Sequence, residues 1–168
     1  MADDLGAAGA SAFDTSRFRQ VLGHFCTGIV VVTASDENGP VGLTCQSFCS
    51  VSLDPPLVLF CPARSSTSWP RIKAVGHFCA NILAEDQEDV SRVFATRGAD
   101  KFAGVGWKTG TSGAPMLNGV LAHVDCTLEE AHDGGDHDIA IGRVVDLAMD
   151  HEGRPLLFFR GGYGRFEA

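Results

Sequence analysis

The first periodic segment of the chain has its apolar residues on one face of a helix. Four of them recur at intervals of three and four positions, as along an amphipathic helix. They are Phe18, Val21, Leu22 and Phe25. Carboxylate and hydroxyl residues at 14–16 offer an N-terminal cap, and Gly28 stands near the expected end. The pattern predicts a helix at the start of the fold.

A strand pattern follows this helix. The run GIVVVTAS at 28–35 is apolar and β-branched, and residues 36–39, DENG, have the composition of a hairpin turn. The stretch VGLTCQSFCSVSLDPPLVLF at 41–60 is therefore expected to return as the second strand. Its middle carries small polar side chains, and Pro55 and Pro56 interrupt it before LVLFCP.

Short helices and strands alternate further along. SSTSWPRIKAVG places hydroxyl residues ahead of a short helix, HFCANIL follows as a strand, and 85–96 is expected to form a helix. The inward side chains of that helix would be Val90, Val93 and Phe94. Residues 97–119 are rich in Gly, Thr, Ser and Pro, which predicts a long and functional loop. Three further strands are expected, near 120–130, 139–149 and 155–160.

Strands joined by short hairpins, with helices only at the edges, favour a closed or nearly closed antiparallel sheet over a parallel one. We therefore predict a mainly β fold, a barrel with flanking helices. At 168 residues the chain suits one domain, expected over 14–168 after a disordered leader at 1–13. It contains neither G-x-G-x-x-G after a strand nor G-x-x-x-x-G-K-[ST], so a phosphate would need another kind of binding site.

Composition excludes several classes of protein. Thirteen Lys and Arg residues against twenty-one Asp and Glu residues give a net charge of −8, which repels nucleic acid. No apolar run is long enough for a membrane span, and the N-terminus lacks a secretory signal, so we expect a cytoplasmic protein. The six cysteines form no C-x-x-C pair and are expected to pack as small buried hydrophobes rather than form disulfides or a zinc site.

Two stretches have the composition of a ligand site. Small hydroxyl residues beside Gly42 would let a flat ligand approach the strand backbone, although a half-exposed strand tolerates the same residues. In CPARSSTSWP, Arg64 stands beside the hydroxyl residues 65–68 where a helix should begin. This segment predicts a phosphate site, with a simple helix cap as the alternative.

Two further stretches carry charge in loops. ADKFAGVGW places Lys101 beside Phe102 among glycines, which fits either a ligand-covering loop or an ordinary surface lysine above a core phenylalanine. HDGGDHD at 132–138 has enough His and Asp for a metal cluster, but acid-rich hairpin turns are common and its ligand spacing is loose. We therefore expect no metal.

Six motifs occur in the order seen in one family, the short-chain flavin reductases. They are FRQVLGHFCTGIVVVTA, VGLTCQSFCSVSLDPPLVLFCP, RSSTSW, DKFAG, DGGDH and LLFFRGGYG. From about Phe18 to Phe166 the chain resembles these reductase components of two-component flavin-dependent monooxygenases. The resemblance implies a split β-barrel of the antiparallel Greek-key type. It also implies a homodimer that binds FAD or FMN without the usual nucleotide-binding fold.

The resemblance also implies three groups of site residues. Along the isoalloxazine ring it places Val41, Gly42, Leu43, Thr44, Gln46 and Ser47. Around the ribityl phosphate it places Cys61, Pro62, Ala63, Arg64, Ser65, Ser66 and Thr67, with Lys101 and Phe102 closing from the loop. Near the nicotinamide it places His137, Arg160, Gly161, Gly162 and Tyr163.

The implied activity is that of an NAD(P)H:flavin oxidoreductase which supplies reduced flavin to a partner monooxygenase. Hydride transfer between two cofactors needs no nucleophile or strong acid or base, so no catalytic side chain is expected. NADH is favoured as the donor because the sequence shows no Arg cluster for a 2′-phosphate. Two alternatives stay open: a non-enzymatic flavin-binding module, and a split-barrel oxidase that holds its flavin tightly.

Overall fold

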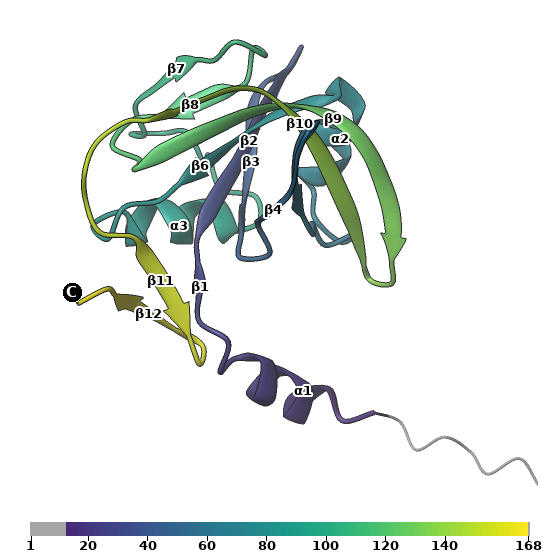
Figure 1. Ribbon diagram of the computed structural model, residues 1–168, viewed down its shortest axis with the longest axis vertical. Helices are drawn as coiled ribbons and strands as arrows, with labels where there is room; N and C mark the ends of the chain where they lie inside the picture. The colour runs from purple at the N-terminus through teal and green to yellow at the C-terminus, as the bar shows by residue number, and fades with distance from the viewer. Residues whose placement is uncertain (1–12, 168) are drawn as a thin grey trace, which may run out of the picture.

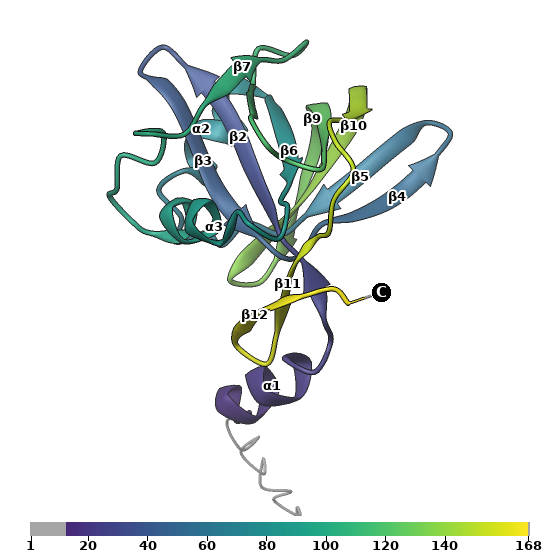
Figure 2. The same cartoon turned by 90° about the vertical axis from the view of Figure 1, so that its left-hand side faces the viewer.

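The computed structural model describes residues 13–167, so the predicted leader at 1–13 lies outside the described residues except for Phe13. A seven-stranded antiparallel sheet forms the body of the protein (Figures 1 and 2). Its spatial order is β3-β2-β6-β9-β10-β5-β4. The strands are β2 (Val30–Asp36), β3 (Gly39–Cys45), β4 (Cys49–Leu53), β5 (Pro56–Phe60), β6 (His77–Ile82), β9 (Ala122–Gly134) and β10 (His137–Met149). The predicted mainly β fold is confirmed.

The sheet curls into a barrel that is split between its two end strands. β3 and β4 follow each other in the sequence, yet within residues 13–167 each pairs on one side only, with β2 and β5 respectively. The stretch 41–60, predicted as one returning strand, therefore contributes to three strands. Its polar middle includes the connection 46–48, which crosses the split from one edge strand to the other.

The first part of strand β2 is continuously apolar because both of its faces are covered there. Val30 and Val32 pack into the barrel interior, whereas Val31 and the preceding Ile29 pack into a second cluster with Phe94. A strand buried on both faces has no solvent side and therefore shows no alternation of polar and apolar residues. The hairpin predicted between β2 and β3 is confirmed, with Asp36 opposite Gly39.

Two short helices flank the barrel as predicted. They are α2 (Trp69–Val75), which packs on β2 and β3, and α3 (Glu88–Ala95), which packs on β3. In α3 the buried residues are Ser91 and Phe94, while Val90 and Val93 are only half-buried. No helix in the described part of the chain has the length and apolarity needed to cross a bilayer.

The first helix, α1 (Thr15–Leu22), begins with Asp14 as its cap but ends earlier than predicted, at Gly23 rather than near Gly28. Its apolar face does not pack on the barrel. Figures 1 and 2 show the helix standing below the sheet, and none of its residues is buried among residues 13–167. The amphipathic pattern is therefore present in the sequence without a partner surface in the described part of the chain.

The predicted long loop at 97–119 contains a small hairpin instead. It is formed by β7 (Trp107–Thr109) and β8 (Pro115–Leu117), and β8 is buried. The side chain of Asn81 fixes it there, because its Oδ1 accepts from the backbone N–H of Leu117 at 2.7 Å and its Nδ2 donates to Val31 O at 3.0 Å. The Gly- and Thr-rich composition concealed these strands.

A second small sheet, of order β1-β11-β12, leads from the barrel toward α1. Its strands are β1 (Thr27–Gly28), β11 (Leu156–Phe159) and β12 (Gly162–Arg165), of which only β11 was predicted. Arg160 and Gly161 form the two-residue turn between β11 and β12, with φ of 51° and 82°. Positive φ at both positions is the geometry of a tight hairpin turn.

Candidate functional site

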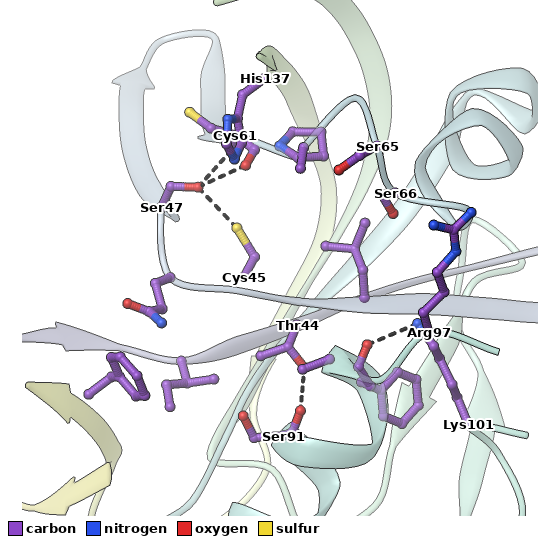
Figure 3. Close-up of a pocket in the computed structure, with 18 of the residues that line it drawn as sticks. Thr44, Cys45, Ser47, Cys61, Ser65, Ser66, Ser91, Arg97, Lys101 and His137 are labelled. Atoms are coloured by element: carbon purple, nitrogen blue, oxygen red, sulfur yellow. Dashed lines mark hydrogen bonds between the residues drawn. The ribbon is translucent and has the colours of Figure 1, made fainter. Parts of the chain in front are cut away.

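A cleft of about 700 Å³ lies at the split of the barrel. Its walls are the end of β3, the connection 46–47, the segment 61–67 after β5, helix α3 with the residues that follow it, and the first residue of β10 (Figure 3). Phe158 and Tyr163 contribute aromatic surface from the small C-terminal sheet. The volume is within the range of pockets that hold cofactor-sized ligands.

Two hydroxyl groups of the predicted ring-binding strand hold the walls together. Ser47 Oγ accepts from the backbone N–H of Cys61 at 2.8 Å and lies 3.0 Å from Cys45 Sγ, which joins the connection 46–47 to the end of β5. Thr44 Oγ1 donates to Ser91 O at 2.6 Å, which joins β3 to α3. Burial raises the pKa of the Cys45 thiol, so this sulfur stays neutral in the cleft wall.

The segment 61–67 is fixed by the tip of the β9–β10 hairpin. Backbone N–H groups donate from Arg64 to Asp136 O and from Asp138 to Pro62 O, both at 3.0 Å, and Ala63 pairs with His137 as an isolated bridge. The sequence stretches predicted for the phosphate and for the nicotinamide therefore lie side by side.

Asp138 stabilises the contact between the segment 61–67 and β10. Its carboxylate accepts from Trp69 Nε1 at 2.9 Å, Arg64 Nε at 2.8 Å and Lys73 Nζ at 3.2 Å. The hydrogen bonds from Trp69 and Arg64, with the Lys73 ammonium, hold the pKa of Asp138 far below its usual range. A carboxylate this well satisfied fixes α2 and the segment before it to β10. Within residues 13–167 no group of three His, Cys, Asp or Glu side chains is placed to hold a metal ion.

Ser66 supports the start of helix α2, although the N-cap residue is Ser68, whose own side chain makes no cap hydrogen bond. Ser66 Oγ accepts from the backbone N–H groups of Ser68 at 3.2 Å and Trp69 at 3.3 Å. Even so, Ser65, Ser66 and Thr67 all line the cleft. The cap and a ligand site therefore occupy the same short segment and do not exclude each other.

Lys101 reaches the cleft wall from the loop after α3. Its ammonium donates to Gly42 O at 2.9 Å, to Phe94 O at 2.9 Å and to Ser68 Oγ at 3.3 Å. Partial burial lowers the pKa of Lys101. A cation at the last carbonyls of α3 also compensates the negative end of the helix dipole. Its three donors thus join β3, α2 and α3 behind the cleft.

His137 lines the cleft from the first position of β10. Its Nδ1 lies 2.7 Å from Asp136 Oδ1, and this contact holds the pKa of Asp136 below its usual range. With Nδ1 occupied by the carboxylate, Nε2 is the ring atom available to a ligand.

Most of the predicted site residues line the cleft. They are Leu43, Thr44, Gln46, Ser47, Cys61, Pro62, Ala63, Ser65, Ser66, Thr67, Lys101, His137 and Tyr163. Tyr163 reaches it from β12 and is held by a 2.9 Å hydrogen bond between its hydroxyl and Ser91 Oγ.

The remaining predicted residues are not among those that line it, for separate reasons. Val41 is part of the barrel core, and Arg64 turns toward Asp133 and Asp138. Phe102 packs edge-on against Phe94, behind the wall. The others, which support the site only through the backbone or a turn, are Gly42, Arg160, Gly161 and Gly162.

Gly42 stands close to the cleft wall without lining it. A Cβ at this position would lie 2.7 Å from the ring of Phe94, which does line the cleft. The glycine is therefore required for the close approach of α3 to β3 rather than for a ligand.

The sequence did not point to the cleft residues contributed by α3 and its end. They are Ser91, Phe94, Ala95 and Arg97. Cys45, Ile29 and Phe158 were also missed. A serine three positions before Phe94, on the inward face of a helix, was the one available signal. No sequence signal pointed to Arg97, because the position of its side chain depends on how α3 packs.

Comparison with known proteins decides the family. Residues 22–167 match the model of the flavin reductase like domain. The chain belongs to this family. The resemblance inferred from the six motifs is confirmed, and with it the assignment as a flavin reductase enzyme.

One close relative is a reductase subunit of a flavin-dependent monooxygenase, HsaB of Rhodococcus jostii. It is 53% identical over 162 residues, which cover 96% of this chain and 83% of the relative.

Two solved flavin reductase family structures superpose closely. Nitrilotriacetate monooxygenase component B from Mycobacterium thermoresistibile has a TM-score of 0.89 at 51% identity, covering 94% of this chain and 89% of the other. The Streptomyces globisporus NADH:FAD oxidoreductase SgcE6, solved with NAD and FAD fragments, has a TM-score of 0.87 at 38% identity, covering 92% and 93%. The predicted split-barrel fold is confirmed.

Proposed function

We propose that the cleft binds FAD or FMN together with NADH, that hydride passes from NADH to the flavin, and that the reduced flavin is released to a partner flavin-dependent monooxygenase. The observation that carries this is the composition of the cleft. Hydroxyl groups, backbone amides, the aromatic rings of Phe94, Phe158 and Tyr163, and basic side chains line it, and no Asp or Glu is among its described lining residues. Such walls suit a planar, anionic cofactor.

The bound flavin would supply the hydride acceptor, and the residues of this chain would orient the two cofactors. The end of β3 offers its backbone to the ring, and the segment 61–67 offers hydroxyl and amide donors to the phosphate. To the nicotinamide we assign His137 and Tyr163, which both line the cleft. No residue is needed as acid or base, since stacking geometry and hydrogen bonding are what such a transfer requires from the protein.

The relatives support this assignment over the two alternatives. The R. jostii protein is a monooxygenase reductase subunit and the S. globisporus protein is an NADH:FAD oxidoreductase. Neither description fits a flavin carrier or an oxidase with its own organic substrate. A cytoplasmic location is also proposed, because all six cysteines are free thiols, which suits a reducing compartment.

The activity is tested by mixing the purified protein with NADH under air, with FAD, FMN or riboflavin added and without any organic substrate. We expect NADH consumption well above the rate without enzyme, and slower consumption of NADPH. The bound flavin should be lost on desalting, because a released product is held loosely. NADH consumption at the rate without enzyme would refute the proposal, and a flavin retained through desalting would favour an alternative.

The proposed assembly is a homodimer. Apolar side chains are exposed on α1, on β4 and along the end of β10, and a second cavity beside α1 is lined mainly by apolar residues. The most exposed of these side chains are Leu53, Leu147 and Met149, and Phe25, three residues after the end of α1, is also exposed. A helix as short as α1 is marginal without a packing partner, so a second subunit covering it would account for both features.

We expect sedimentation at micromolar concentration to give twice the chain mass. Leu22→Asp would place a carboxylate in the apolar face of α1 and shift the protein toward monomer, because a buried unpaired charge opposes association. Gln20→Asp adds the same charge to the same exposed helix, outside the residues that line the second cavity, and should leave the dimer intact. A wild-type protein that sediments only as monomer would contradict the proposal.

A further inference from the structure

The basic side chains around the cleft differ in what they already bind. Three of them line it, Arg97, Lys101 and His137, and Arg64 stands just outside. In a chain with an excess of acidic residues, a cleft with this charge is suited to an anion. Which of the three Lys and Arg side chains meets the flavin phosphate depends on which has unused donors and an uncompensated charge.

Arg64 and Lys101 are both engaged with other protein groups. Arg64 pairs through Nε with Asp138 at 2.8 Å and through Nη2 with Asp133 at 3.0 Å, so two carboxylates neutralise its charge. Lys101 uses its three donors on Gly42 O, Phe94 O and Ser68 Oγ. An ammonium group has only three donors, so none is left for a ligand unless the wall opens.

Arg97, by contrast, is not engaged with other groups of the described chain. It follows α3 by two residues, lines the cleft and is exposed. Figure 3 shows its guanidinium turned toward the segment of Ser65 and Ser66. Among residues 13–167 it has no side-chain hydrogen bond or ion pair. A guanidinium has five donors in a planar fork that matches two phosphate oxygens.

We propose that Arg97 is the cation that binds the phosphate attached to the ribityl chain, and that it sets the preference for FMN and FAD over riboflavin. Ser65 and Thr67 complete the site as neutral donors, while Lys101 is a positioning residue that holds α3, and with it Arg97, against β3. This inference rests on the proposed function, because it names a residue of the same flavin cleft.

The test is equilibrium binding of oxidised riboflavin, FMN and FAD in the absence of NADH, followed by flavin fluorescence. Arg97→Ala should weaken FMN and FAD by about 10- to 100-fold, the usual worth of hydrogen bonds to a charged group, and change riboflavin less than about twofold. Arg97→Lys should recover part of the loss. Raising the salt concentration should weaken FMN binding to the wild type more than to Arg97→Ala.

Arg154→Ala is the matched control. Arg154 is also an exposed arginine without a side-chain bond to the described residues, and it does not line the cleft. It should bind all three flavins like the wild type. Thermal unfolding of Arg97→Ala should be nearly unchanged, since the substitution removes no hydrogen bond or ion pair within the described chain.

Three results would overturn the inference. Equal losses for all three flavins would make Arg97 a structural residue, and no loss would remove it from the site. A loss for FAD without a loss for FMN would place it at the second, adenosine-linked phosphate. If the wild type bound none of the three flavins, the proposed function itself would fail, which is a different outcome from any of these.

Discussion

A Ser66→Asp protein is expected to bind FMN and FAD at least about tenfold more weakly than the wild type, with riboflavin affected little. The carboxylate would stand in the segment 61–67, where the proposed flavin phosphate lies. At a separation of about 5 Å and an effective dielectric constant of about 20, two negative charges repel by roughly 3 kcal/mol. Water in an open cleft reduces this value, so about tenfold is the lower expectation.

Two variants separate the effect of the added charge from the effect of the hydrogen bonds that Ser66 accepts at the start of α2. Ser66 Oγ accepts from the N–H groups of Ser68 and Trp69, and an Asp side chain accepts in the same way. Ser66→Asp should therefore keep α2 and the thermal stability of the protein. Ser66→Asn is the control of the same shape without the charge, and it should bind all three flavins like the wild type. Should Ser66→Asp lose affinity equally for riboflavin, FMN and FAD, the segment would be only a helix cap.

His137→Ala is expected to raise the KM for NADH by about tenfold while leaving flavin affinity nearly unchanged. The ring lines the cleft, and because Asp136 occupies Nδ1, Nε2 is the nitrogen left to bond a ligand. In the neutral ring Nε2 accepts a hydrogen bond, which suits the carboxamide NH₂ of the nicotinamide. Such a contact is present before and during hydride transfer, so kcat should change little.

His132→Ala is the matched control for this experiment. His132 lies on the same hairpin, pairs with Glu130 at 2.9 Å, and is not among the residues that line the cleft. It should keep the wild-type KM. A His137→Ala protein that lost flavin affinity at unchanged KM for NADH would move His137 to the flavin side, and a small loss of thermal stability alone would leave it as a turn residue bonded to Asp136.

Local patterns were sufficient for most of the elements. The hairpin of β2 and β3, the short helix after SSTSW and the strand HFCANIL depend on turn residues, caps and β-branched runs that act within a few positions. The family could also be predicted, because six motifs in order are more specific than any one of them. The errors came where packing decides, as in the β7–β8 hairpin, which Asn81 ties to the barrel across 36 residues of sequence.

The burial of the individual cysteines also could not be predicted from local sequence. Cys45, Cys79 and Cys126 are buried as expected, and burial raises the pKa of Cys126 to about 12. Cys26 and Cys49 are exposed within the described chain, beside the second cavity. The exposed Cys26 and Cys49 each follow a phenylalanine, whereas the buried Cys45 and Cys126 each stand between two polar residues. Local composition therefore does not distinguish a cysteine facing the core from one facing outward.

The mainly β fold, the family and most residues of the cleft could be predicted from the sequence, because each of these depends on the order and spacing of residue types along the chain. Which cations are free to bind a ligand could not be predicted, because it depends on tertiary packing. Arg64 and Lys101 look like ligands for a phosphate in the sequence, yet Asp133 and Asp138 pair with the first, and carbonyl groups of β3 and α3 occupy the second. These partners lie from 7 to 74 residues away. The partner that neutralises a charged side chain is set by the packing of segments distant in the sequence, not by the residues next to it in the chain.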